Sequence, residues 1–206
     1  MHVAIIGSGK IGATLARRFT ETGHEVTIVN SRGAESLAPL VGELGEHAHA
    51  AADIASAAAA GDVIVLAVPF FLYDQLPAGA FAGKIVVDAT NYFPGRDGPL
   101  ADLEQDRTTS SELIAAHLVG AHVVKAFNTM VWTQLGADGR PAGDRDRLLL
   151  FVAGDDADAK AAVIALADAI GFDTIDHGGL AAGRAQQPGS AVFGTSLTLA
   201  QASRAS

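Results

Sequence analysis

The chain alternates between short, continuous apolar runs and longer segments in which alanine mixes with polar residues. The apolar runs are rich in β-branched residues and predict strands at residues 3–6, 26–29, 63–68, 85–87, 122–127 and 148–152. Most of these runs are continuous rather than alternating. That pattern is typical of parallel strands that are covered by helices on both faces.

Helical patterns lie between these runs, at residues 10–22, 35–44, 110–117 and 156–170. The alanine-rich segment 50–60 predicts a further short helix packed on the sheet, because alanine is the best helix former. Strands that alternate with helices at this spacing predict an α/β fold, a Rossmann-type doubly wound and mainly parallel sheet.

Two segments rich in glycine, proline and charge, 91–106 and 135–146, predict exposed loops. Neither has the composition of an interdomain linker, so residues 1–206 are interpreted as a single oxidoreductase domain. Residues 1–130 form its dinucleotide-binding core. Residues 131–206 are expected to add a small C-terminal extension of strands and helices that covers the pocket.

A glycine-rich motif follows the first strand directly and opens the first helix. It consists of Gly7, Ser8, Gly9, Lys10, Ile11 and Gly12. The first glycine permits a tight turn, the second lets the backbone approach a pyrophosphate, and the third lets helix and strand pack closely. The free N–H groups at the helix start favour an anion. The motif and its context therefore predict a dinucleotide site, in which Lys10 either adds positive charge or is simply solvated.

The end of the second predicted strand indicates which dinucleotide binds. NAD enzymes usually carry Asp or Glu there for the ribose 2′-hydroxyl, but this chain has Asn30, Ser31 and Arg32. A carboxylate would repel a 2′-phosphate, whereas neutral donors and a planar guanidinium suit it. These residues favour NADP(H) as the cofactor.

In an open α/β sheet the ligand lies at the carboxyl ends of the strands. Three predicted strands end at polar or small residues that we expect around the ribose and the nicotinamide: Ala67, Val68, Pro69, Asn91, Ala126 and Asn128. Pro69, with the phenylalanine after it, would give an apolar wall. Asn91 and Asn128 would supply neutral amides.

Familiar catalytic arrangements are missing from the sequence. Neither Tyr92 nor Tyr73 is followed four residues later by a lysine, the seven histidines are scattered, and no cysteine is present. The sequence therefore proposes no catalytic residue and no metal. Hydride transfer that needs little acid–base assistance fits this pattern best.

The charge balance restricts the partners. With 14 basic and 23 acidic residues the net charge is −9, which opposes attraction to nucleic acid or anionic lipid. No stretch is apolar for long enough to span a bilayer, and no signal peptide is visible. The expectation is a cytoplasmic protein with a small-molecule or cofactor acceptor as partner.

At these motifs the chain resembles the F420-dependent NADP reductases (NADPH:F420 oxidoreductases), and it is similar to the oxidoreductase domain of the STEAP metalloreductases. The resemblance covers nearly the whole chain and rests on residues 7–12, 30–32, 68–70, 124–129, 152–156, 176–180 and Arg184. It implies a compact and commonly homodimeric NADP-binding fold. Hydride would pass between NADP(H) and a deazaflavin (F420) or a flavin such as FMN or FAD. Ser31 and Arg32 would hold the 2′-phosphate, and Pro69, Ala126 and Asn128 would lie beside the nicotinamide.

Two other functions stay open at this point. In one, NADPH reduces a small carbonyl or imine, with Tyr92 or His177 as the proton donor that such a reaction needs. In the other, the chain senses NADP(H) without turnover.

Overall fold

The structure, a computed structural model, describes residues 1–205, and one sheet of eight strands organises this part of the chain. Its spatial order is β3-β2-β1-β4-β5-β6-β7-β8. All neighbours are parallel except β6 and β7. The strands are β1 (His2–Ile6), β2 (Glu25–Val29), β3 (Ala48–Ala50), β4 (Val63–Leu66), β5 (Ile85–Asp88), β6 (His122–Lys125), β7 (Leu149–Gly154) and β8 (Asp173–Asp176). The order reverses between β1 and β4, which is where a doubly wound sheet binds its ligand.

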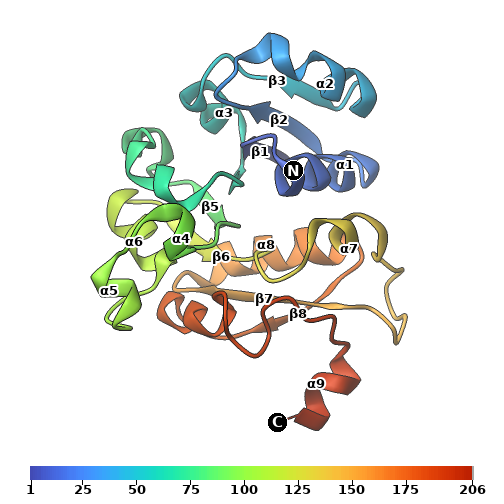
Figure 1. The fold of residues 1–206 in the computed structure, drawn as a ribbon. Helices are drawn as coiled ribbons and strands as arrows, with labels where there is room; N and C mark the ends of the chain where they lie inside the picture. Colours follow the sequence, from blue (N-terminus) through green and yellow to red (C-terminus); the bar gives the residue numbers. More distant parts are fainter. Residues whose placement is uncertain (206) are drawn as a thin grey trace.

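The helices connect these strands, and Figure 1 shows the N-terminal elements (blue) and the C-terminal elements (orange and red) at opposite ends of the molecule. The α-helices are α1 (Lys10–Glu21), α2 (Ala38–Leu44), α3 (Ile54–Ala60), α4 (Pro94–Asp97), α5 (Ala101–Glu104), α6 (Ser110–His117), α7 (Trp132–Ala137), α8 (Ala157–Ala169) and α9 (Leu199–Ala205). Short 3-10 helices cover Ala34–Leu37, Phe70–Gln75, Ala78–Phe81 and Leu180–Gln186.

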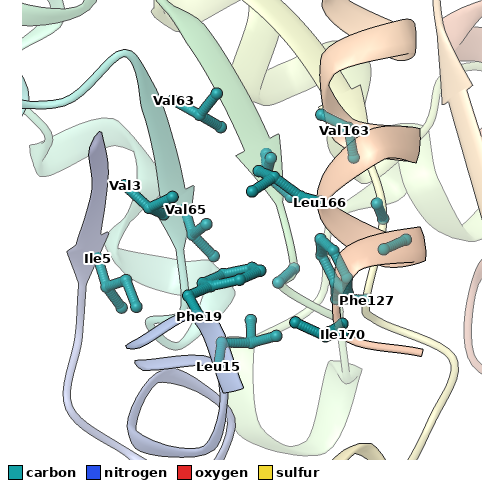
Figure 2. Close-up of a cluster of buried hydrophobic side chains, with 14 of the residues drawn as sticks. Val3, Ile5, Leu15, Phe19, Val63, Val65, Phe127, Val163, Leu166 and Ile170 are labelled. Carbon is teal, nitrogen blue, oxygen red and sulfur yellow. The ribbon is translucent and has the colours of Figure 1, made fainter. Parts of the chain in front are cut away.

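Successive side chains of each strand point to opposite faces, and both faces are buried. In β1, Val3 and Ile5 belong to one apolar cluster, whereas Ala4 and Ile6 belong to another on the opposite side. Figure 2 shows the first cluster, in which side chains of β1 and β4 meet those of α1 and α8. Phe19 at its centre is fully buried, and burial of such a side chain stabilises the fold by about 1.5–3 kcal/mol. Two buried faces explain the continuous apolar runs.

The sequence predictions hold for the fold class and for the main elements. β3 and β8 were not among the six predicted runs because β3 is only three residues long and three of the four residues of β8 are polar. The segment 91–106 is not simply a loop, since it contains α4 and α5. The segment 135–146 begins inside α7. In both places side-chain and backbone hydrogen bonds order residues whose composition favours loops.

The C-terminal part joins the sheet as well as the ligand site. β7 and β8 extend the sheet beyond β6 rather than lying over its edge. The segment near Phe193 contacts the chain after β6, where the Gly194 N–H donates to the Thr129 carbonyl at 2.8 Å. None of the helices in residues 1–205 is long and apolar enough to cross a membrane.

Candidate functional site

The turn between β1 and α1 requires glycine at two positions. Gly7 has a φ of +108°, and a Cβ there would lie 2.4 Å from the Ala67 carbonyl oxygen. A Cβ on Gly12 would lie 1.9 Å from the carbonyl oxygen of Gly7. A Cβ on Gly9 would meet no atom within 4 Å. A side chain at Gly7 would strain the turn and one at Gly12 would clash with it, whereas open space lies beside Gly9.

The N-terminus of α1, which directly follows the glycine turn, has no side-chain cap. Its N-cap residue, Gly9, provides no capping side chain, and its first turn contains no acidic residue. In contrast, Asp53, Thr109 and Asp156 cap α3, α6 and α8 by accepting backbone N–H bonds. The uncapped N–H groups and the helix dipole of α1 therefore favour an anion such as a phosphate.

The loop after β2 is held together by the Asn30 side chain. Its Nδ2 donates to Ser8 Oγ at 2.9 Å and to Ser36 Oγ at 3.0 Å, and its Oδ1 accepts from the Arg32 backbone N–H at 2.9 Å. The Arg32 guanidinium donates to Ser8 Oγ at 3.3 Å. No carboxylate of the described residues lies within 4.0 Å of it, so its charge is available to a ligand.

This loop and the glycine turn border a cavity of about 400 Å³, here called the Arg32 cavity. Its polar side presents Ser8, Asn30, Ser31 and Arg32. Its other walls come from Ile6, Gly7, Gly9, Val29, Ile54, Ala67, Val68, Pro69, Leu72, Gln75 and Leu76. A flat aromatic group would find apolar walls here, beside the cation.

A second cavity of about 300 Å³, the Trp132 cavity, lies at the ends of β5 and β6. It is lined by Ile11, Ala89, Asn91, Phe127, Asn128, Thr129, Met130, Val131, Trp132, Phe193 and Gly194. A third, the bridging cavity of about 230 Å³, is lined by Gly9, Lys10, Ile11, Ala67, Val68, Pro69, Ala89, Thr90, Asn91, Phe93 and Arg96. Because it shares wall residues with both of the others, the three form one groove along the carboxyl ends of the strands.

Two asparagines join the strand ends inside this groove. Asn91 Nδ2 donates to the Asn128 carbonyl oxygen at 3.0 Å, and Asn128 Nδ2 donates to Asn91 Oδ1 at 3.0 Å and to the Gln186 carbonyl at 2.7 Å. Asn128 is 5% exposed, and its Oδ1 is a buried acceptor without a partner among the described residues. Leaving such an acceptor unpaired costs about 1–3 kcal/mol, so a ligand N–H would be well placed to satisfy it.

A buried ion pair supports these asparagines. Lys125 and Asp88 are fully buried, with Nζ and Oδ2 3.0 Å apart, and Nζ also donates to the Thr90 carbonyl at 3.2 Å. Burial alone would raise the pKa of Asp88. The charge of Lys125 and the hydrogen bonds from Ser111 and Thr90 outweigh it and hold that pKa below its usual value. The pair therefore fixes the turn that leads into Asn91.

Comparisons with known proteins agree with this geometry. Residues 2–92 match the family described as "NADP oxidoreductase coenzyme F420-dependent". The solved structure of a hypothetical protein, SMa0349 from Sinorhizobium meliloti, is 35% identical with a TM-score of 0.83. That match covers 96% of this chain and 95% of the other. The solved structure of a candidate F420-dependent NADP reductase from Arthrobacter sp. FB24 is 30% identical with a TM-score of 0.77. It covers 95% of this chain and 98% of the other.

The chain belongs to the F420-dependent NADP oxidoreductase family. It is therefore an oxidoreductase of an NADP-dependent family. Metalloreductase STEAP3 of Rattus norvegicus is 34% identical over 185 residues, which is 88% of this chain. The chain spans only 35% of the length of that relative.

In this family member, most of the predicted site residues line the groove. Those in the three cavities are Gly7, Ser8, Gly9, Lys10, Ile11, Asn30, Ser31, Arg32, Ala67, Val68, Pro69, Asn91 and Asn128. Gly12 lines none of the three cavities and lies against the Gly7 carbonyl, where a Cβ would not fit. Ala126 is 1% exposed and belongs to the core beneath the site. The Lys10 ammonium lies over the Trp132 ring, 5.3 Å from its centre.

The two residues considered as proton donors have structural partners instead. The Tyr92 hydroxyl donates to the Gly98 carbonyl at 2.9 Å and accepts from the Leu100 N–H at 2.9 Å. His177 packs on the Phe151 ring at a centroid distance of 4.9 Å, and burial lowers its pKa. Neither residue lines any of the three cavities.

Sequence reasoning missed the walls that come from distant segments. Ile54, Leu72, Gln75 and Leu76 complete the Arg32 cavity; Met130, Trp132 and Phe193 complete the Trp132 cavity. The Lys125–Asp88 pair was also missed. One available signal was a lysine inside the apolar run 122–127, because a buried charge requires a partner.

Proposed function

We propose that this enzyme transfers a hydride between NADP(H) and a planar acceptor of the deazaflavin (F420) or flavin type. The observation that carries the proposal is the wall of the Trp132 cavity. It combines apolar and aromatic side chains with the amides of Asn91 and Asn128 and the hydroxyl of Thr129, and it contains no carboxyl, imidazole, phenol or amine. Such a wall can hold two flat rings against each other, but it offers no strong acid.

NADP(H) fits the rest of the groove. The pyrophosphate would take the uncapped N–H groups of α1 and the open space beside Gly9. Arg32, which has no carboxylate partner, would hold the 2′-phosphate together with Ser31, while Asn30 keeps their loop in place. The adenine would lie between the apolar walls near Ile54 and Leu76.

The nicotinamide end would then lie at the bridging and Trp132 cavities. Ala67, Val68 and Pro69 would face one side of the ring, and Ala126 would support it from below. The free Oδ1 of Asn128 would accept an N–H of the carboxamide. Asn91 would hold Asn128 in this orientation through their two hydrogen bonds.

Bound NADPH supplies the hydride. The enzyme's own residues align the rings and exclude water, and direct hydride transfer depends mainly on such distance and orientation. Because the cofactor carries the hydride and the protein positions the rings, the proposed reaction needs no catalytic acid at the site. Reduction of a small carbonyl or imine would need a proton donor, and the hydroxyl of Tyr92 is already engaged elsewhere.

We also propose a homodimer, which the family resemblance implies, and a cytoplasmic location, which the sequence analysis predicts. The oligomeric state is directly testable by light scattering coupled to gel filtration, where we expect the mass of two chains.

The experiment that tests the function is NADPH oxidation, followed by absorbance, with F420, FMN or FAD as acceptor and a small ketone or cyclic imine as comparison. We expect turnover with at least one ring acceptor and none with the ketone or imine. Micromolar NADPH binding without turnover of any ring acceptor would contradict the proposal. Turnover of the imine alone would instead favour the alternative in which NADPH reduces a small carbonyl or imine.

A further inference from the structure

Few cations of this acidic chain are available to a ligand. The side chains of Arg17, Arg18, Arg96, Arg107, Lys125, Arg140, Arg147, Lys160 and Arg184 each lie within 4.0 Å of a carboxylate. In residues 1–203, whose side chains are described, the cations without such a partner are Lys10, Arg32, Lys84 and Arg145. Only Lys10 and Arg32 line the groove. The groove therefore presents two positive charges that have no carboxylate partner in residues 1–203. The proposed function assigns one of them, Arg32, to the 2′-phosphate of NADP(H).

Lys10 lies toward the acceptor end of the groove. Its side chain leaves the first turn of α1 and places Nζ 5.3 Å from the centre of the Trp132 ring. Trp132 is 39% exposed and lines the cavity that contains Asn91 and Asn128. Lys10 lines the bridging cavity, and its ammonium lies over the ring of a residue that lines the Trp132 cavity.

The pyrophosphate does not require this side chain. The backbone N–H groups at the start of α1 and the space beside Gly9 already provide its site. The contact between Lys10 and Trp132 is a cation–π interaction, which is weak at an exposed position. A phosphate near Lys10 could therefore draw Nζ away from the ring at little cost, because a charge-assisted hydrogen bond is stronger.

Arg96, the other cation of the bridging cavity, is not available in the same way. It forms a two-point contact with Asp97, at 2.7 and 2.9 Å, and it donates to the Asn91 carbonyl at 2.6 Å. Its charge is balanced and its geometry is fixed. Lys10, unlike Arg96, is thus free to move toward an anionic group of the acceptor.

We infer that Lys10 and Trp132 form a recognition site for an acceptor nucleotide: Trp132 contacts the flat ring, and Lys10 binds a phosphate on the acceptor's side chain. This inference rests on the proposed function and deepens it. The enzyme would use a phosphorylated flavin or deazaflavin and would discriminate against the same ring without its phosphate. Lys10 is then a specificity-determining residue for the acceptor rather than a ligand of NADP(H).

FMN and riboflavin test this inference because they share the ring and differ in the phosphate. The chain contains a single tryptophan, so its fluorescence reports on this cavity directly. We would titrate each flavin into the enzyme with saturating NADP+ and compare the wild type with Lys10→Gln. The wild type should bind FMN about tenfold more tightly than riboflavin, which corresponds to one charge-assisted contact. Lys10→Gln should reduce FMN affinity to the riboflavin level and leave riboflavin and NADP+ binding within about twofold.

Arg145→Gln is the matched control, since it removes one unpaired cation that lies on a separate hollow with Leu199. It should leave the FMN preference unchanged. If Arg145→Gln lost as much FMN affinity as Lys10→Gln, the preference for FMN would come from the overall charge of the protein, and the inference would be wrong. A loss of NADP+ affinity in Lys10→Gln, or equal losses for FMN and riboflavin, would also overturn the inference.

These results are distinguishable from a failure of the proposed function. If neither flavin binds and NADPH is not oxidised by F420, FMN or FAD, the function and the inference fail together. If NADPH is oxidised but Lys10→Gln shows no selective loss for FMN, only the role of Lys10 is refuted.

Discussion

The Arg32 cavity and the Trp132 cavity belong to one groove but are built in different ways. The first is made by the glycine turn at residues 7–9, by the loop at residues 30–32 and by mainly apolar walls that all precede residue 77. The second collects residues from positions 11 to 194, and most of them carry apolar or aromatic side chains. The shape of the Arg32 cavity depends on the glycines and on the geometry of the helix start. The shape of the Trp132 cavity depends on which side chains pack together.

This difference should separate cofactor binding from acceptor specificity. The anion site at α1 uses backbone N–H groups, which every residue type except proline carries, so changes of side chain around it should alter cofactor binding little, except at the glycines and at Arg32. Under the proposed function, single substitutions at side chains such as Lys10 or Trp132 should change the acceptor site without disturbing the cofactor. Acceptor specificity should therefore vary independently of NADP(H) binding.

The largest expected effect comes from Gly12→Ala. The added Cβ would lie 1.9 Å from the Gly7 carbonyl, so α1 must move away from β1. We expect NADPH affinity to fall at least 100-fold and stability to fall by about 1–3 kcal/mol. Calorimetric titration and urea unfolding measure the two. Gly42→Ala is the control, because a Cβ at this helical position meets nothing within 4 Å and should stabilise α2 by up to about 1 kcal/mol. NADPH binding unchanged in Gly12→Ala would refute the close-packing role.

The buried pair beneath the acceptor half should have the largest effect on stability, whereas the effect of Gly12→Ala is largest on NADPH binding. Lys125→Met leaves Asp88 charged, buried and unpaired, which should cost about 3–5 kcal/mol in urea unfolding. The double variant Lys125→Met/Asp88→Asn removes both charges and should recover much of that loss. A single variant as stable as the wild type would show that the pair does not hold this region.

The same pair gives a dependence on pH. The pKa of Asp88 is depressed in the folded state, so its contribution to stability is present above the ordinary aspartate pKa of about 3.9. That contribution is lost as the pH falls through the lower folded value. Between pH 5 and pH 3 the wild type should therefore lose more stability than the double variant. Equal slopes in urea unfolding would contradict this cause.

Arg32→Ala should affect only the cofactor half. Removing a guanidinium from the 2′-phosphate should weaken NADPH by about 10- to 100-fold, because hydrogen bonds to charged groups are worth roughly 1.5–3 kcal/mol. NADH, which lacks this phosphate, should change by less than twofold. Equal losses for NADPH and NADH would refute the proposed role of Arg32.

The smallest effect is expected from Asn128→Leu, which removes the unpaired Oδ1 and the contacts of Nδ2. The rate of hydride transfer in a single turnover should fall by about tenfold as the nicotinamide loses its orientation, while binding of NADPH changes little. Asn91→Ala, which only removes support from Asn128, should have a smaller effect in the same direction. A change in NADPH affinity without a change in rate would contradict the orienting role.

The contrast between the two halves also explains what the sequence could predict. The glycine motif and Arg32 act within short stretches, and their roles follow from turn and helix geometry that any βαβ unit shares. The wall formed by Trp132 and Phe193 depends on the packing of α7 and of the segment that follows η4 (Leu180–Gln186), which no local pattern specifies. Asp97 likewise orders α4 by accepting the Phe93 N–H at 2.7 Å, although the composition there favours a loop.

The central claim is that the groove aligns two rings for direct hydride transfer, and isotope transfer tests it most directly. The enzyme would be mixed with F420 and NADPH deuterated at C4 of the nicotinamide, in each of its two stereochemical forms. A deazaflavin retains a hydride received at carbon, so we predict that deuterium from one form alone appears in the reduced deazaflavin and that the single-turnover rate shows a primary isotope effect. Reduced acceptor that contains only solvent hydrogen, or no reduction although NADPH is bound, would contradict the account.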